Sequence, residues 1–247
     1  MTSGMSLDCP AYIVQARSPQ LPLRYVWDDT RASKDFRSSG AWVLEAARGL
    51  CPRARLVLCV GLYEWVMWRF DGLHDDPRPL QFAEAAWCGT IDPRFMRFFE
   101  LDRTDWLGPV AGPLWCAITW LRPALADGDS RPQEVDEALH YLTRLAVHVM
   151  PRPDDFRAWL QTTLARLVEA FPAFPDDPFE DLFDRYPGVR RGPWIDRRAL
   201  DPDEPAVGEE EAIRWLRLVC VDALANGNPY VQRLVRQDSV APEGAIR

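Results

Sequence analysis

The sequence contains almost no lysine. Lys34 is the only one among 247 residues, and the other 28 basic side chains are arginine. Together with abundant alanine, proline, aspartate and tryptophan, this bias is typical of translation from a GC-rich genome, and we expect a bacterial source. The functional alternative is selection for arginine itself, whose planar guanidinium binds carboxylates through two parallel hydrogen bonds.

Motifs of familiar catalytic sites are also missing. The sequence has no G-x-S-x-G, no glycine-rich phosphate loop and no H-E-x-x-H. Its three histidines and six cysteines form neither a C-x-x-C nor a Cys/His zinc spacing. We therefore expect no cofactor and no metal, and the pattern leans toward a protein that is not an enzyme.

Long hydrophobic runs are absent as well. No apolar run reaches the roughly 18 residues of a membrane-spanning helix, and the first residues lack the pattern of a signal peptide. Most cysteines lie within apolar helical runs, as buried reduced thiols do. These absences predict a cytoplasmic protein that does not contact a membrane.

Positive charge is in deficit. The net charge is −8 with a pI of about 5.0, and no basic stripe is visible. Proteins that bind the phosphate backbone usually show the opposite sign, so nucleic acid is not expected as a partner. An acidic chain remains compatible with a partner protein that has a basic surface.

Apolar residues dominate one stretch, residues 56–70, which reads LVLCVGLYEWVMWRF. Thirteen of its fifteen residues are apolar or glycine, and only Glu64 and Arg69 are charged. Apolar side chains therefore surround the whole helix, which is typical of the buried centre of a helical protein. We expect a mostly α fold: a single-domain helical bundle, or a short stack of helical hairpins, of about eight helices.

Proline and glycine punctuate the rest of the chain and set the expected organisation. Residues 39–171 form a helical core, 172–208 an ordered excursion rich in Pro, Asp and aromatic residues, and 209–247 C-terminal helices with a tail. The expected helices cover residues 41–50, 56–70, 80–90, 94–101, 114–125, 131–149, 155–171, 209–226 and 229–237, with a break at 108–112. Residues 1–38 form an N-terminal extension, in which 11–15 and 23–27 either pair as a small β-hairpin or lie extended over the core.

Glu64 is the most unusual residue, because a carboxylate in an apolar helix must be paired or have a raised pKa. The structural interpretation pairs it with Arg69, Arg55 or an arginine of a neighbouring helix. The catalytic interpretation places it with Glu84 in a buried cavity, where the two carboxylates act as acid and base. This small helical enzyme is the alternative to a binding protein.

Two further patterns suggest metal sites, and each has an objection. Glu137 and His140 form an E-x-x-H pair like those of di-iron bundles, but no second pair exists and both should face water. His140, Arg144 and His148 follow at i, i+4 and i+8 on the same outer face, where the alternatives are a recognition stripe and, by default, a solvated face. The pairs Asp75-Asp76 and Asp176-Asp177 suggest magnesium–diphosphate chemistry, but their proline neighbours indicate loops.

The remaining signal is an acidic surface with aromatic anchors. Its candidate binding residues are Asp176, Asp177, Phe179, Glu180, Asp181, Phe183, Asp184 and Trp194. Exposed aromatic residues among charges are typical of protein interfaces, and acidic surfaces attract basic partners. The sequence favours a non-enzymatic, bacterial protein-interaction module, such as an adaptor or a toxin-neutralising (immunity-type) protein.

Overall fold

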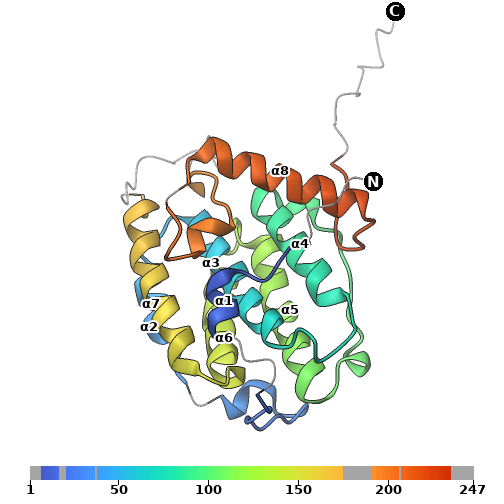
Figure 1. Cartoon of the computed structure of the whole chain (residues 1–247). Helices are drawn as coiled ribbons and strands as arrows, with labels where there is room; N and C mark the ends of the chain where they lie inside the picture. The colour runs from blue at the N-terminus through green and yellow to red at the C-terminus, as the bar shows by residue number, and fades with distance from the viewer. Residues whose placement is uncertain (1–6, 17–20, 37, 175–190, 206, 235–247) are drawn as a thin grey trace, which may run out of the picture.

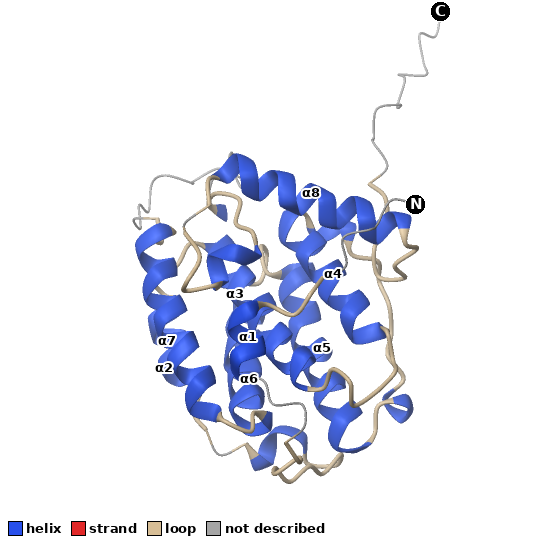
Figure 2. Cartoon of the chain, in the orientation of Figure 1, coloured by secondary structure: helices blue, strands red, loops and turns tan. Residues whose placement is uncertain are grey.

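The protein is mostly helical in the part of the chain that the structure describes (Figures 1 and 2). This computed structural model describes residues 7–16, 21–36, 38–174, 191–205 and 207–234. These residues form eight α-helices and no strand, which confirms the predicted mostly α fold. The helices are α1 (Ala11–Ala16), α2 (Ala41–Ala47), α3 (Pro52–Arg69), α4 (Arg78–Ile91), α5 (Gly108–Asp127), α6 (Pro132–Val149), α7 (Pro153–Ala170) and α8 (Glu209–Ala225).

Helix α3 is the centre of the fold, as the apolar run predicted. Fifteen of its 18 residues are buried, including Glu64 and Arg69. It packs against α4, α5 and α6, and the 3-10 turn η5 (Arg197–Leu200) covers a further side. Gly61 favours that approach, because a Cβ there would lie 2.6 Å from Leu200 Cδ1 and would force that side chain to shift. A helix covered on all sides has no need of a polar face.

Helix α8 lies across one end of the molecule, at the top of Figure 1, where it packs on α4. Trp87 of α4 meets Trp215 of α8 edge-on, with ring centroids 5.2 Å apart. The predicted span 209–226 is confirmed. Gly227 follows the helix with a φ of 69°, the left-handed conformation in which many helices end.

The predicted N-terminal β-hairpin is wrong. Residues 11–16 form helix α1, whose first turn bonds to the carbonyl of Pro10, and residues 23–27 form no regular element. Adjacent side chains Tyr12 and Ile13 are both buried, which an edge strand would not allow but a short helix in a groove does. The burial of these two side chains therefore outweighs the β propensity of the segment's β-branched and aromatic residues.

Helix α5 also differs from its prediction, because it begins at Gly108 and runs through Pro113 and Pro123. The expected break at 108–112 is therefore wrong. Proline at 113 removes the N–H that would bond to the carbonyl of Pro109, four residues earlier. The Tyr25 hydroxyl donates to that carbonyl instead. A tertiary hydrogen bond thus compensates for a local helix-breaking residue.

The helices predicted at 94–101 and 229–237 are wrong within the described residues. The first is only the 3-10 turn Pro93–Phe95, capped by Asp92 as expected. Residues 229–234 are not helical: Arg97 N donates to Tyr230 O at 2.8 Å, and Val231 forms a β-bridge with Met96. The two segments satisfy each other's backbone groups, so neither needs a helix.

Candidate functional site

Seven of the eight predicted binding residues lie outside the described residues. They are Asp176, Asp177, Phe179, Glu180, Asp181, Phe183 and Asp184. Trp194 is the one member that the structure places. We call the sequence from 175 to 190 the acidic segment.

Both ends of the acidic segment are fixed to the start of α3. Before it, Cys51 N donates to Phe171 O at 3.0 Å, and Ala173 N donates to Gly49 O at 2.8 Å. After it, Arg53 Nε donates to the carbonyl of Gly192 at 3.2 Å. Residues 49–53 therefore hold the chain where it enters the segment and where it leaves it. A loop whose ends are tied together on a rigid core is a common carrier of binding residues.

Trp194 is half-buried at this anchor. The Arg53 guanidinium lies 3.7 Å from its ring centroid, and its backbone N–H donates to Glu209 Oε1 at 2.9 Å. A cation–π contact with a desolvated arginine is worth about 2 kcal/mol, so the indole is held in place. Trp194 therefore links the returning chain to α3 and α8, and only its remaining edge can reach a partner.

Glu64 is fully buried and completely paired. Its Oε1 accepts from Trp87 Nε1 at 2.7 Å, and its Oε2 accepts from Arg197 Nε at 2.8 Å. Arg197 Nη2 also lies 2.8 Å from Oε2, and the guanidinium is 14% exposed. The hydroxyl of Tyr12 is buried without a partner, and burial, followed by the charge of Glu64, raises its pKa. The arrangement is a closed ion pair and leaves no free oxygen on Glu64.

The sequence had also suggested Arg69 and Arg55 as partners for Glu64, and both are engaged elsewhere. Arg69 Nε donates to the carbonyl of Val149 at 3.2 Å, and burial lowers its pKa. Arg55 forms an ion pair with Asp136. The true partner follows Glu64 by 133 residues, a separation that no local spacing could indicate.

Glu84 occupies a different environment. Its Oε2 accepts from Asn228 Nδ2 at 2.9 Å, and burial raises its pKa, although the hydrogen bond from Asn228 opposes this. Nothing connects Glu84 with Glu64 in the described structure: neither is a hydrogen-bond partner of the other, and each has its own donors. An acid–base pair made of these two carboxylates is therefore not supported by their contacts.

A cavity of about 370 Å³ opens where the first turns of α3 and α6 meet the last turns of α4 and α5. Three arginines line it, Arg53, Arg55 and Arg191, against a single carboxylate, Asp129. Much of the remaining lining is apolar. This arginine cavity was missed by the sequence reasoning. The available signal was P-R-A-R at residues 52–55, which places two cations at the positive end of a helix dipole.

The outer face of α6 is covered, not solvated. We call residues 21–36 and 38–40 the N-terminal arm. Arg144 Nε donates to Ser38 O at 2.9 Å, its Nη2 donates to Phe36 O at 2.8 Å, and His148 Nε2 lies 2.9 Å from Val26 O. The expected solvated face is wrong because these side chains bind the backbone of the arm. Glu137 is exposed, and it forms no site with His140.

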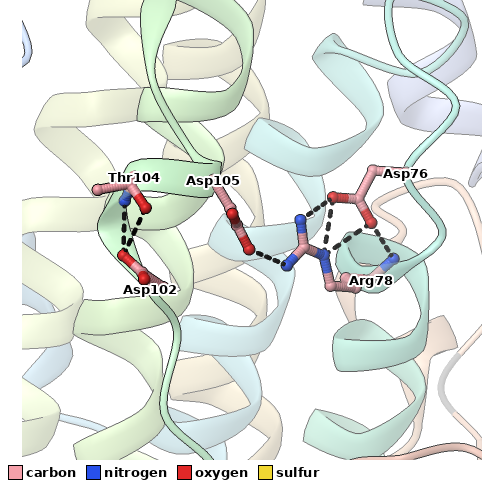
Figure 3. Close-up of polar contacts among 5 residues, drawn as sticks. All are labelled: Asp76, Arg78, Asp102, Thr104 and Asp105. Carbon is pink, nitrogen blue, oxygen red and sulfur yellow. Dashed lines mark hydrogen bonds and ion pairs between the residues drawn. The ribbon is translucent and has the colours of Figure 1, made fainter.

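Asp76, one of the first aspartate pair Asp75-Asp76, has a structural role (Figure 3). Asp76 accepts from Arg78 N at 2.9 Å and from Arg78 Nε, while Arg78 Nη1 donates to Asp105 at 3.4 Å. Asp102 accepts from the backbone and the hydroxyl of Thr104. No group of three or more His, Cys, Asp or Glu that could hold a metal occurs in the described ranges. The second aspartate pair of the magnesium–diphosphate hypothesis, Asp176-Asp177, lies outside the described residues.

Comparison of the chain with protein-family models, with curated proteins and with solved structures found no match. None of the helices in the described ranges is both long enough and apolar enough to cross a bilayer. None of the six cysteines forms a disulfide, and five are buried.

Proposed function

We propose that this protein is a non-enzymatic interaction module that binds a partner protein with a basic surface through the acidic segment. An adaptor or a toxin-neutralising, immunity-type protein would fit this role. The observation that supports it most directly is the anchoring of both ends of the acidic segment by residues 49–53.

Anchoring matters because a binding loop loses less conformational entropy on association when its ends are already fixed. Arg53 supports the anchor twice, through the carbonyl of Gly192 and through the face of Trp194. Gly192 has a φ of 89°, and a Cβ there would lie 2.4 Å from Cys51 Sγ. The return of the chain to α3 therefore needs glycine at this position.

The alternative is a small enzyme that uses Glu64 and Glu84, and the contacts favour it less. Glu64 has its charge neutralised by Arg197 and both oxygens occupied, so it has no free lone pair directed at a substrate. A catalytic acid or base must reach a substrate atom within hydrogen-bond distance.

The test is affinity capture from the lysate of the source cell, followed by mass spectrometry. The variant reverses three charges of the acidic segment, Asp176→Arg, Asp177→Arg and Glu180→Arg. The control makes the same change in net charge on exposed residues elsewhere, Glu45→Arg, Glu100→Arg and Glu137→Arg. Both variants must unfold at the same denaturant concentration as wild type.

A partner captured by wild type and by the control, but lost by the segment variant, supports the proposal. Its capture should also weaken with salt, because exposed charge–charge attraction is screened. A partner retained equally by both variants, or no partner at all, contradicts the acidic segment as the binding surface.

A further inference from the structure

We propose that the arginine cavity binds a small organic monocarboxylate with an apolar body, and that Arg53 is the residue that binds the carboxylate. The assignment does not depend on the proposed partner protein, although Arg53 also holds the chain at Gly192, just after the acidic segment.

Arg53 is a buried cation with one unused donor group. The residue is only 7% exposed. Its Nη1 donates to Thr90 O at 2.6 Å, its Nε donates to Gly192 O, and one ring face of Trp194 lies against it. Its Nη2 has no hydrogen-bond partner among the described residues, and the side chain lines the cavity. Carbonyls and an indole hold the guanidinium in one orientation, which leaves two N–H groups of Nη2 for a ligand.

Among the described residues, Arg53 forms no ion pair with a carboxylate, unlike its two neighbours. Arg55 is paired with Asp136, and Arg191 is paired with Asp129. Burial, followed by the charge of Arg191, lowers the pKa of Arg53 to about 10, so the guanidinium remains protonated at neutral pH. A buried charge without a counter-charge is costly, and an anion in the cavity would remove that cost.

The helix that carries Arg53 increases the positive potential. Arg53 follows Pro52, the first residue of α3, and the first turn of α3 contains no acidic residue. The N-terminal end of a helix carries a partial positive charge and stabilises anions, not cations. The dipole and the guanidinium therefore act in the same direction. Arg55, which also lines the cavity, has a buried Nε without a partner.

The class of ligand follows from the number of unpaired charges in the cavity and from the residues that line it. One uncompensated guanidinium matches one negative charge, which favours a carboxylate over a phosphate dianion. Leu56, Leu125 and Val135 are among the apolar residues that make up most of the remaining lining, so the body of the ligand should be apolar. A volume of about 370 Å³ lies at the lower end of the range of small-molecule sites.

Isothermal titration calorimetry of the full chain tests this assignment. The probes are phenylacetate, 4-methylpentanoate and octanoate, with phenylacetamide as the neutral isostere and inorganic phosphate as the dianion. Arg53→Gln removes the charge, and Leu56→Trp fills the cavity while Arg53 remains. Arg94→Gln is the matched control, because it removes an exposed arginine that does not line the cavity.

We expect at least one carboxylate to bind with a dissociation constant of about 1 mM or tighter, and phenylacetamide at least about tenfold more weakly than phenylacetate. Arg53→Gln and Leu56→Trp should each weaken carboxylate binding at least about tenfold, and Arg94→Gln should leave it unchanged. Because Leu56→Trp keeps Arg53 and its contacts, it decides the question even if Arg53→Gln does not fold.

Three results would overturn the proposal. The first is that none of the three carboxylates binds wild type at about 5 mM. The second is that phenylacetamide binds as tightly as phenylacetate, which would mean that the charge is not used. The third is that phosphate binds more tightly than every carboxylate, which would assign the cavity to a different class of anion.

Discussion

Replacing Glu64 by glutamine should destabilise the protein strongly, although the two side chains have nearly the same shape. Glutamine leaves no cavity, so the loss is electrostatic. Its amide oxygen can accept from Trp87 or from Arg197, but not from both, and its NH2 group then faces a donor. Arg197 also loses its one carboxylate partner among the described residues, while its side chain is 14% exposed.

The magnitude follows from these contacts. Removing one member of a buried ion pair typically costs about 3–5 kcal/mol, because the other charge stays buried and unpaired. The remaining exposure of Arg197 gives its guanidinium partial access to water, so we expect about 3 kcal/mol for Glu64→Gln. For a chain of this length, that corresponds to a fall in Tm of about 6–12 °C.

Urea unfolding followed by circular dichroism measures this loss. The double variant Glu64→Met/Arg197→Met should be more stable than Glu64→Gln alone, because two apolar side chains leave no unpaired charge. A free energy of unfolding for Glu64→Gln within about 0.5 kcal/mol of wild type would refute the reasoning, since a solvated pair contributes no more than that.

Three further predictions concern packing and the cysteines. Arg144→Ala should release the N-terminal arm and speed proteolysis there, with global stability lowered by about 1–3 kcal/mol, because three backbone carbonyls lose a charged donor. Gly112→Ala should lower the free energy of unfolding by about 1–3 kcal/mol, because its Cβ would lie 2.3 Å from Trp27 Nε1; urea unfolding measures this. Burial raises the pKa of Cys59 and raises the pKa of Cys116 to about 12, so a thiol reagent should label native protein at Cys9 only, as peptide mapping would show.

The helical core could be predicted from the sequence because its signals are local. The apolar run from 56 to 70 and the stripe of α6 depend on periodicity within one helix, and both are confirmed. The errors occur where a distant residue decides the local structure. Pro113 lies inside a helix because Tyr25 binds the carbonyl that it leaves free, and residues 229–234 are not helical because residues 95–97 bind their backbone.

Features of the candidate sites that lie within one helix could be predicted, and features that depend on the tertiary fold could not. Glu64 was recognised as unusual because charge in an apolar run is visible locally, but its partner Arg197 was not. The arginine cavity combines the ends of four helices, so its volume is a tertiary property. Its one local signal, P-R-A-R at residues 52–55, was not recognised, because the helix was expected to begin at residue 56 and not at Pro52.

Glu84 should respond to substitution in the opposite way from Glu64. Burial penalises the charged form of Glu84 and raises its pKa, and its one side-chain donor is the neutral amide of Asn228. Glu84→Gln keeps an acceptor for that amide and removes the charge. At pH 7 the variant should therefore equal wild type or exceed it by about 0.5 kcal/mol or less.

The dependence on pH provides the control for this prediction. A carboxyl group with a raised pKa in the folded state destabilises folding above its unfolded pKa of about 4.3 and has no effect below it. Any advantage of Glu84→Gln should thus be present at pH 7 and disappear as the pH falls below about 4. A loss of about 2 kcal/mol or more at pH 7 would contradict this prediction. It would mean that the charge of Glu84 is stabilised by a cationic partner, as the charge of Glu64 is stabilised by Arg197.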